Sequence, residues 1–598
     1  MVDPLRAAPR SSAHRPSLNN ACLQFQAAAA VLVSILTIIA SLPVRAEDLS
    51  TLNQIQERYE AVHAQVSPAV VAVQCRGAKA GGGFYGTGVV LTPDGLALTS
   101  CTVVPPNTHL VQVLFTDGRV MDAKVIETDN VTETCALQII RAPEDNTPLP
   151  YVELSDSTKV RVGELAYTAG NPFHTISRDG QVAWSVGTIS GLYKIISADE
   201  QSHYNGPVLE TDAAVNPGSD GGSLIDSNGR LLGILSLCFC ESRWLGTAIP
   251  AHLIKNSLAV LKNVPLVDPK SPARFGSLES AITARAIPEA LIAATRPATI
   301  ATVKVLVHRN FTPTMDHHGS LVSRLRQRPD SPVTGVIIDS EGYIITSAFN
   351  VEGDVANIDV QLSDGTTMPA TLLGRNLGLD VAVLKVVHPK GLLLPAIPLC
   401  GDPDLKIGRV VAILGSSEDG PQTHTTGIVS ALGRLDGAAV QTDALTNYGN
   451  SGGPVVDLNG RLVGIASQVR THTDWSENSG VGFFTQSDKI IQSLGDLKAG
   501  RDIKAPTRPF LGVSPVETAT EVRGVKLEEV IPLSAADNAR LQAGDVIVAV
   551  DGMDTHSWPA LVRILKAHKS GDSIEITYQR GSVTTRTQTV LTSRKDVR

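Results

Sequence analysis

TDALTNYGNSGGPVVD, at residues 442–457, has a near copy earlier in the chain, TDAAVNPGSDGGSLID, at residues 211–226. Both copies lead into Gly-Arg-Leu and then an apolar run, GRLVGIASQ in the later copy and GRLLGILSL in the earlier one. The copies lie 231 residues apart, which is far longer than the period of a solenoid repeat. The sequence therefore predicts a duplicated domain.

The segments upstream of each copy repeat as well. GTGVVLTPDGLALTS at residues 86–100 corresponds to VTGVIIDSEGYIITS at residues 333–347, with an offset of 247. Each reads as two short β-branched strands joined by a Pro-Asp-Gly or Ser-Glu-Gly turn, which is typical of a β-hairpin. We therefore predict two all-β domains of about 200 residues, at 47–265 and 297–497, joined by a linker with a helix at 266–296.

A third unit is expected at 507–595. It opens with RPFLGV and continues with LQAGDVIVAVDG, a helix around 558–569 and two closing strands, DSIEITYQR and TRTQTVLTS. Pro, Lys, Arg and Gly occur together at 497–507, as expected of a linker between domains.

Residues 1–46 read as a targeting segment. Arg6, Arg10 and Arg15 precede an apolar run, AAAAVLVSILTIIASL, and then the small residues that a signal peptidase requires. This run of 16 residues is shorter than the roughly 20 that span a bilayer, so a cleaved signal peptide is preferred over an uncleaved membrane anchor. Removal of the segment takes away four Arg and one Asp and changes the formal net charge from −8 to −11. We expect an extracytoplasmic protein, either periplasmic or secreted.

The composition excludes several classes of protein. The 598 residues contain 51 Lys and Arg against 59 Asp and Glu, and only 4% are aromatic. A nucleic-acid-binding protein needs a basic surface and stacking rings, so we expect no nucleic acid partner. Seven cysteines in a chain of this length are too few for a disulfide-dense scaffold.

The hairpins that end in Thr-Ser, the segment GLDVAVLKV and the stretch TDALTNYGNSGGP together resemble the trypsin-like serine protease domain of the HtrA (Deg) family. The C-terminal unit resembles the PDZ domain that follows the protease in that family. The resemblance covers nearly all of residues 60–595. It implies a mainly β fold with two tandem chymotrypsin/trypsin-like double β-barrel domains and a C-terminal PDZ domain.

The chemistry of that family uses a serine nucleophile, a histidine base and an aspartate that orients the imidazole. In the second copy, Ser451 matches the serine, Asp380 matches the aspartate, and the N–H groups of Gly449 and Ser451 match the oxyanion hole. The histidine position holds Phe349, and a shift by one residue would place only Asn350 there. Neither side chain accepts a proton with useful basicity.

In the first copy, all three positions differ from the family pattern. Thr102 stands at the histidine position, Thr134 at the aspartate position and Asp220 at the serine position. The Asp220 carboxylate is expected to lie beside the oxyanion hole, where it would exclude a substrate carbonyl. We therefore predict that the first domain is inactive and that the second keeps a vestigial triad.

Several other side chains are alternatives as a base for Ser451. His424 belongs to a later strand of the second barrel, far from the site in this family, and His317 and His318 sit in a loop insertion that nothing in the spacing brings to the cleft. Lys385 follows the aspartate by five residues, an odd spacing that points its side chain to the opposite face of a strand. The sequence therefore favours none of them as a replacement for the missing histidine.

The cysteines suggest no metal chemistry. Cys101 and Cys135 flank the altered triad positions of the first copy, while Cys238 and Cys240 share one strand face. Because no Cys-x-x-Cys or His spacing accompanies them, we predict no metal site and no cofactor. Small buried thiols or one disulfide are the favoured alternatives.

In the C-terminal unit, Phe510, Leu511, Gly512 and Val513 match the loop of a PDZ domain that receives a peptide's C-terminal carboxylate. A peptide would bind there by adding a β-strand to the sheet edge. A PDZ domain with a purely structural role is the alternative.

The sequence as a whole predicts an exported HtrA-like protein that is a catalytically inactive protease homologue. We expect it to bind peptides or unfolded protein segments in protein quality control, and the resemblance implies a homo-oligomer of the trimeric kind. The alternative is an active serine endopeptidase that uses Ser451 with a non-standard general base.

Overall fold

The computed structural model describes residues 46–593, apart from 78–82, 106–107, 143, 197–203, 237–245, 272–285, 311–331, 388–392, 403, 417–421, 436, 447, 468–479, 506–508, 517–523 and 556–557. The predicted targeting segment therefore lies outside the described residues, apart from its last residue. Within the described part, none of the helices has the length and apolar character needed to cross a bilayer.

The first large domain consists of a leading helix and two β-barrels. Helix α2 (Ala46–Val66) and a 3-10 turn, η1 (Ser67–Ala69), lead into the first barrel. That barrel is closed in the order β1-β2-β3-β6-β5-β4. Its strands are β1 (Val70–Gly77), β2 (Gly83–Val90), β3 (Leu96–Ser100), β4 (Thr108–Leu114), β5 (Val120–Asp129) and β6 (Thr134–Ile139).

The second barrel of this domain is a sheet in the order β11-β8-β9-β10-β13-β12-β7-β14, in which β11 also pairs with β12 and so closes the ring. Its strands are β7 (Leu154–Ser155), β8 (Leu165–Gly170), β9 (Ala183–Ile196), β10 (Asn205–Thr211), β11 (Ser223–Asp226), β12 (Leu231–Leu235), β13 (Gly246–Pro250) and β14 (Leu266–Val267). The helices are α3 (Thr175–Asp179) and α4 (Ala251–Ser257), with 3-10 turns η2 (Ser157–Lys159), η3 (Pro172–His174) and η4 (Ala259–Leu261).

The second large domain repeats this plan. Helix α5 (Ala286–Ala301) leads into a closed barrel of order β15-β16-β17-β20-β19-β18, and a second closed barrel follows in the order β21-β22-β23-β26-β25-β24. The strands are β15 (Thr302–Arg309), β16 (Val333–Ile337), β17 (Tyr343–Thr346), β18 (Val355–Gln361), β19 (Thr367–Asn376), β20 (Val381–Val386), β21 (Val410–Ser416), β22 (Gln422–Arg434), β23 (Ala439–Thr442), β24 (Pro454–Asp457), β25 (Leu462–Ala466) and β26 (Gly482–Gln486). The turns η6 (Ala348–Val351) and η7 (Tyr448–Asn450) and the helix α6 (Ser487–Lys498) complete it.

The C-terminal domain is a small sheet with two helices. Strands β28 (Val513–Pro515), β29 (Val525–Val530), β30 (Val546–Val550), β32 (Ser573–Arg580) and β33 (Val583–Val590) follow one another in the sheet. Strand β31 (Met553–Asp554) pairs with β30, and β27 (Pro509–Phe510) pairs with β34 (Thr592–Ser593). The helices are α7 (Ala535–Asn538) and α8 (Trp558–Lys566).

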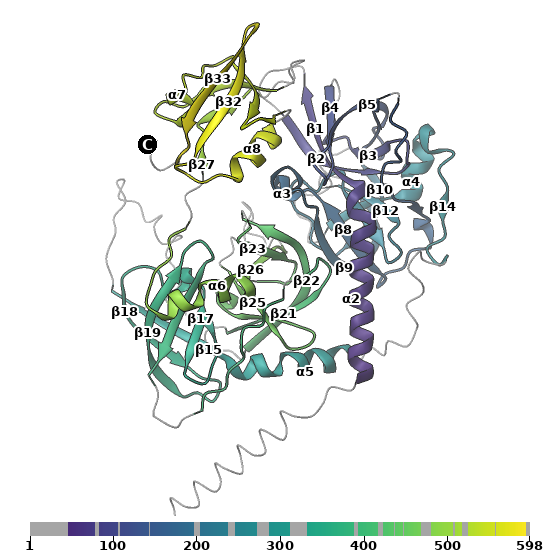
Figure 1. The fold of residues 1–598 in the computed structure, drawn as a ribbon. Coiled ribbons are helices and arrows are strands. Elements are labelled where there is room, and N and C mark those ends of the chain that lie inside the picture. The colour runs from purple at the N-terminus through teal and green to yellow at the C-terminus, as the bar shows by residue number, and fades with distance from the viewer. Residues whose placement is uncertain are drawn as a thin grey trace, which may run out of the picture.

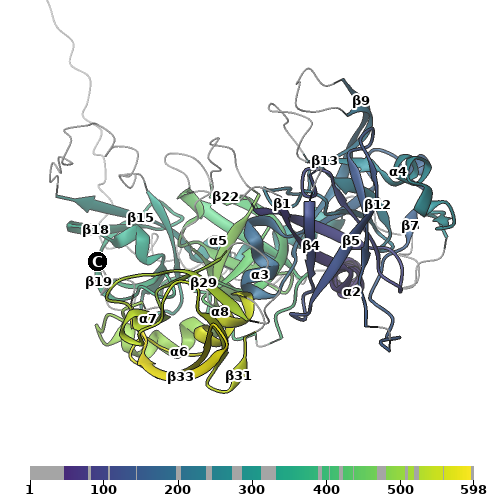
Figure 2. The ribbon, with the colours of Figure 1, turned by 90° about the horizontal axis from the view of Figure 1, so that it is seen from above.

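The fold is therefore mainly β, with two double-barrel domains and a small C-terminal sheet domain, as the sequence predicts. The two large domains lie side by side, and α2 reaches both of them (Figures 1 and 2). The backbone N–H of Val410 in the second domain donates to Oε1 of Gln56 on α2 at 3.1 Å. A Cβ added to Gly408 would lie 2.7 Å from the backbone nitrogen of Glu60 on the same helix. The hydrophobic core of the first domain also includes Ile428 of the second, so the two domains share a packed interface.

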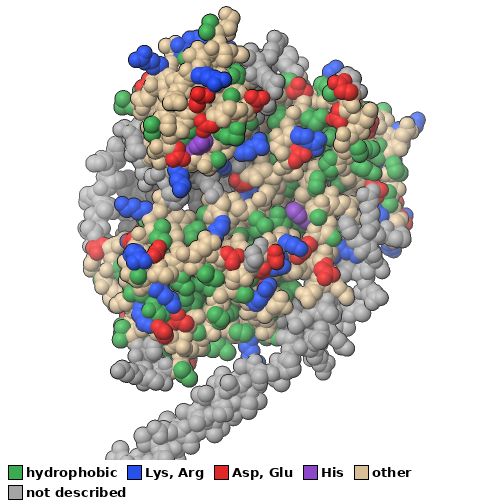
Figure 3. Space-filling view, viewed as in Figure 1, with side chains coloured by type: hydrophobic (Ala, Val, Ile, Leu, Met, Phe, Trp, Pro, Cys, Tyr) green, Lys and Arg blue, Asp and Glu red, His purple; other side chains and the backbone are tan. Residues whose placement is uncertain are grey.

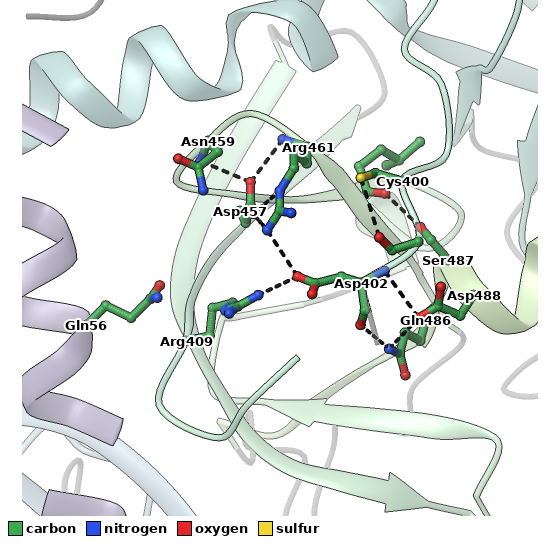
Figure 4. Close-up of polar contacts among 12 residues, drawn as sticks. Gln56, Cys400, Asp402, Arg409, Asp457, Asn459, Arg461, Gln486, Ser487 and Asp488 are labelled. Atoms are coloured by element: carbon green, nitrogen blue, oxygen red, sulfur yellow. Dashed lines mark hydrogen bonds and ion pairs between the residues drawn. The ribbon is translucent and has the colours of Figure 1, made fainter. Parts of the chain in front are cut away.

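A tight turn recurs at the same place in both large domains. Oδ1 of Asp457 accepts the N–H groups of Asn459 at 3.0 Å and Arg461 at 2.9 Å, and the guanidinium of Arg461 also reaches Asp402 at 3.1 Å (Figure 4). The same Asp-x-Asn-Gly-Arg turn occurs at residues 226–230, with matching hydrogen bonds of 2.8 and 2.9 Å. This turn explains the repeated Gly-Arg-Leu of the sequence, because its carboxylate satisfies backbone donors that no strand pairs.

The surface is mixed in charge. On the face drawn in Figure 3, Lys and Arg side chains are scattered among Asp and Glu side chains, and no basic stripe crosses that face.

Candidate active site

The loop that carries Ser451 lies where the two barrels of the second domain meet. The hydroxyl of Thr334 on β16 donates to the carbonyl oxygen of Gly449 at 2.5 Å, which attaches the loop to the first barrel. The N–H of Gly452 donates to the carbonyl of Ala466 on β25 at 2.8 Å, which attaches it to the second barrel. The loop is thus fixed from both sides.

Two glycines allow this close approach. Gly452 has a φ of +83°, and a Cβ there would lie 2.2 Å from Oγ1 of Thr346. A Cβ on Gly453 would lie 2.0 Å from the carbonyl oxygen of Leu414. Both distances are far below van der Waals contact, so packing alone requires glycine at these positions, whether or not the site is catalytic.

Ser451 is buried, with 3% of its surface exposed, and its Oγ has no hydrogen-bond partner among the described residues. Its carbonyl oxygen accepts the side-chain amide of Asn350 at 2.8 Å, and the same amide donates to Oγ1 of Thr346 at 3.0 Å. The Asn350 side chain therefore holds the loop by a hydrogen bond to the backbone carbonyl of Ser451, and not to the Ser451 hydroxyl.

Asp380 is held against the segment where the histidine is expected. It has a φ of +53°, and its backbone carbonyl accepts the N–H of Ala348 at 3.2 Å. Its carboxylate accepts the hydroxyl of Ser347 at 2.7 Å and the backbone N–H of Phe349 at 3.0 Å. The acid is thus positioned as an orienting group would be, but the residue beside it carries a phenyl ring that accepts no proton.

The first domain builds the same loop with different chemistry. The N–H of Gly221 donates to Leu235 at 2.9 Å, and the hydroxyl of Thr87 donates to the carbonyl of Gly218 at 2.7 Å. At the head of this loop, Oγ1 of Thr102 donates to Oδ2 of Asp220 at 3.5 Å, which is a long hydrogen bond. The side chains at the histidine and serine positions therefore contact each other, and neither is the histidine or the serine that the family's triad uses.

The comparisons with known proteins agree with this architecture. The model of the trypsin-like peptidase domain matches residues 86–234 and 333–465, and that of the PDZ domain matches residues 509–591. The putative serine protease HhoA of Synechocystis sp. is 31% identical over 274 residues, which are 42% of this chain and 67% of that protein. The chain belongs to the HtrA family of trypsin-like serine proteases.

The names of two further relatives state a periplasmic location. The periplasmic serine endoprotease DegP of Escherichia coli is 34% identical over 244 residues, 38% of this chain and 50% of DegP. The probable periplasmic serine protease do/HhoA-like of Haemophilus influenzae is 32% identical over 267 residues, 41% of this chain and 55% of that protein. This HtrA-family chain thus spans only about half the length of these two relatives.

The structure corrects one residue of the predicted site. In the second domain, Thr346 pairs with Ala382 across β17 and β20. In the first domain, the equivalent Thr99 pairs with Cys135 across β3 and β6. Strand β6 therefore corresponds to β20 with an offset of 247, so the aspartate position of this HtrA-family domain is held by the next residue upstream of Thr134.

That residue is Glu133, which shares two backbone features with Asp380. Its φ is +47°, and its carbonyl accepts the N–H of Cys101 at 2.8 Å, just as Asp380 accepts that of Ala348. The prediction that Thr134 occupies the aspartate position was wrong. The constant offset of 247 between the two hairpins and turns would have located Glu133, because no insertion separates those segments from β6.

Two of the alternative bases, Lys385 and His424, contact residues other than Ser451. The ammonium of Lys385 donates to the carbonyl of Glu341 at 2.6 Å and lies 4.0 Å from the ring centroid of Tyr343. The Nε2 of His424 lies 3.4 Å from the hydroxyl of Thr299 on α5. His317 and His318 lie outside the described residues.

Four cysteines are candidate metal ligands in the sequence, and no metal site is predicted from them. In the described part of the chain, no group of three or more His, Cys, Asp or Glu side chains is arranged to hold a metal ion. Cys135 is a buried free thiol whose burial raises its pKa to about 11, and Cys101 is partly buried. Cys238 and Cys240 lie outside the described residues.

The loop predicted to bind a carboxylate is part of the PDZ domain of this HtrA-family chain. Gly512 has a φ of +83°, and a Cβ there would lie 2.0 Å from Cβ of Ser534. The carbonyls of Leu511 and Gly512 accept backbone N–H groups from the body of the domain, each at 2.8 Å. Phe510 ends β27, and Val513 begins β28, which is the terminal strand of the sheet and pairs only with β29 among the described strands.

Proposed function

We propose that this chain is an exported, catalytically silent HtrA-family protein that binds peptides or unfolded protein segments in protein quality control. The observation that carries the proposal is the position of Phe349. The carboxylate of Asp380 is bound to Ser347 and to the backbone of Phe349, so the acid is in place while the base is missing.

The energetic argument is one of magnitude. General acid–base catalysis contributes about 10² to 10⁴ in rate, and removal of the histidine from a serine protease triad costs on the order of 10⁶ in turnover. A serine hydroxyl such as that of Ser451 is a poor nucleophile without a base to activate it. In the first domain the serine itself is replaced by Asp220, so a second active site is not available there.

Peptide binding, unlike catalysis, requires no general base. Strand β28 of the PDZ domain ends its sheet, and an extended peptide can add to such an edge through main-chain hydrogen bonds. The loop of Ser451 is held by hydrogen bonds to both barrels of its domain, and backbone N–H groups of such a loop can bind a carbonyl oxygen. An extracytoplasmic location, reached through the signal peptide at 1–46, and a trimeric assembly form part of the same proposal, supported by relatives whose names place them in the periplasm.

The full-length protein tests this proposal with a fluorescently labelled, unfolded casein. Anisotropy is expected to show saturable binding, and mass spectrometry of the same sample is expected to show intact casein. The variant Gly512→Val is expected to weaken binding, because its side chain would collide with Ser534 and distort the carboxylate loop. Gly495→Ala, in the open middle of α6, is the control that should bind as the wild type does. No detectable binding by the wild type would overturn the proposal.

The rival function is that of an endopeptidase that uses Ser451 with another base. The retention of both Ser451 and Asp380 favours it. It predicts casein fragments that disappear in Ser451→Ala, whereas the silent homologue gives no such fragments.

A further inference from the structure

The segment that leads to Ser451 begins with a carboxylate that reaches into the first domain. Asp443 follows β23, and its Oδ1 accepts the N–H of Ile428 on β22 at 2.6 Å, within the second domain. Its Oδ2 accepts the N–H of Val186 at 2.9 Å and the hydroxyl of Ser185 at 3.1 Å, both on β9 of the first domain. Strands β9 and β22 lie side by side in Figure 1.

The contact continues to the corresponding loop of the first domain. The hydroxyl of Ser185 accepts the backbone N–H of Ala214 at 3.0 Å. Ala214 lies six residues before Asp220, and Asp443 lies eight residues before Ser451. A chain of hydrogen bonds through Ser185 therefore links the two loops that stand at the serine positions.

The equivalent residue of the first domain does not form such a link. Asp212 occupies the position of Asp443 in the repeat, and its Oδ1 accepts the N–H of Thr188 at 2.5 Å, as Asp443 accepts that of Ile428. Asp212 is exposed, and every hydrogen bond given for its side chain in the described part stays within the first domain. The local turn is thus common to both repeats, while the contact across the interface is particular to Asp443.

The second domain also covers the hollow beside the loop of Asp220. That hollow is lined by Ser219 and Asn216 of the first domain together with Gln441 and Gly480 of the second. Gly480 has a φ of +61°, and a Cβ there would lie 2.7 Å from Cβ of Ala214. The hollow beside the loop of Asp220 is therefore bounded by residues of both domains.

We propose that the first domain is a built-in support for the loop of Ser451, and that Asp443 and Ser185 are the positioning residues that transmit this support. The inference goes beyond the proposed function, since it concerns what holds the cleft in shape and not what the cleft binds. It also gives the inactive first domain a role that requires no catalysis.

The test uses hydrogen exchange of the full-length protein, with the change made in one domain and the readout taken in the other. Ser185→Ala leaves the N–H of Ala214 without its acceptor and removes one donor from Asp443. Loss of one such buried hydrogen bond is expected to raise exchange of the amides at 444–446 and 449–452 by about five- to tenfold. Amides of the PDZ sheet should keep their wild-type rates.

Three further variants separate positioning from general damage. Asp443→Asn should reproduce the effect, because an amide nitrogen cannot accept the N–H of Val186. Ser185→Thr keeps the hydroxyl and should restore the wild-type exchange. Asp212→Asn removes the matched carboxylate of the first domain and should leave the loop of Ser451 unchanged.

The proposal is overturned if Ser185→Ala changes exchange at 444–452 by less than twofold. It is also overturned if Ser185→Ala and Asp212→Asn change it equally, or if exchange rises uniformly across all domains. These outcomes are independent of peptide binding, so a failure of the proposed function would leave this test intact.

Discussion

The loops around Asp220 and Ser451 have nearly the same backbone and different chemistry. Each rests on a hydroxyl from the first barrel of its domain and on a backbone hydrogen bond to the second barrel. In one loop the serine position carries a carboxylate that accepts a hydroxyl from Thr102, and in the other it carries a serine whose Oγ has no partner among the described residues. The comparison teaches that packing can require the shape of this loop whatever side chain stands at the serine position.

The strongest test of that lesson changes the glycines. Gly453→Ala would place a Cβ 2.0 Å from the carbonyl of Leu414, and the backbone on both sides has little room to yield. We expect a loss of about 4 kcal/mol or more in the free energy of unfolding, measured by urea denaturation. Gly222→Ala, the equivalent change in the first domain, meets its nearest atom at 2.7 Å and should cost less.

Gly495→Ala serves as the control for both variants, because a Cβ there meets nothing within 4 Å and the residue lies inside α6. It should leave the protein as stable or raise its stability by about 0.5 to 1 kcal/mol. If Gly453→Ala behaved like Gly495→Ala, the packing explanation for the persistence of the loop would be wrong.

The next test restores a base to each domain. Phe349→His places an imidazole beside Asp380, and labelling of Ser451 by a fluorophosphonate should rise by at least about a hundredfold over the wild type. Thr102→His places an imidazole beside Asp220, which is no nucleophile towards this reagent, and should give no labelling of the first domain. Equal labelling of both variants, or no labelling of Phe349→His, would contradict the claim that only the second domain keeps a serine nucleophile that lacks a base.

The dependence of stability on pH distinguishes His63, in the first domain, from Asp443, in the second. Burial lowers the pKa of His63, on α2 against Trp184, from 6.5 to about 4. The unfolded chain therefore binds more protons between pH 6.5 and 4, so this group makes the protein less stable as the pH falls through that window. Burial raises the pKa of Asp443 from 3.8 to about 6, so this group makes the protein more stable as the pH falls from 6 to 3.8.

The two effects oppose each other below pH 6, and single variants separate them. When the pH falls from 7 to 5, the free energy of unfolding of His63→Phe should decrease by about 2 kcal/mol less than that of the wild type. The free energy of unfolding of Asp443→Asn should decrease more than that of the wild type over the same interval, because this variant lacks the stabilisation that protonation of Asp443 provides. Thermal unfolding at the two pH values measures both, and identical pH profiles for all three proteins would contradict the assignment.

The smallest effect concerns the hydroxyls beside the altered triads. Ser347→Ala removes a 2.7 Å hydrogen bond to the carboxylate of Asp380, and we expect a loss of about 1.5 kcal/mol in stability. Ser100→Ala removes a 2.8 Å contact with the neutral hydroxyl of Thr102 and should cost about 1 kcal/mol or less. Chemical denaturation resolves the difference, and a larger cost for Ser100→Ala would reverse the ranking of the two sites.

Much of this fold could be predicted from the sequence because its markers are local. Hairpin turns, the Gly-rich loop and the Asp-x-Asn-Gly-Arg turn each depend on residues close together in the chain, and each occurs twice. The displacement of the aspartate position by one residue was missed because Thr134 and Glu133 both fit a loose motif. The constant offset of 247 between the repeats decides between them, and the pairing of β6 with β3 agrees with Glu133.

The contact between Asp443 and Ser185 could not be predicted in the same way. The two residues are 258 positions apart, and Asp443 has the same sequence surroundings as Asp212, which makes no such contact. Such a contact arises from how the two domains pack, and no local pattern encodes it.

The central claim is that Ser451 has no base, and labelling of the wild-type protein tests it most directly. The full-length protein and Ser451→Ala are treated with a fluorophosphonate in parallel with an active trypsin-like protease as the positive control. We predict no Ser451-dependent labelling of the wild type and no Ser451-dependent cleavage of casein in the same preparation. Labelling and cleavage by the wild type that both vanish in Ser451→Ala would contradict the account and identify an active endopeptidase.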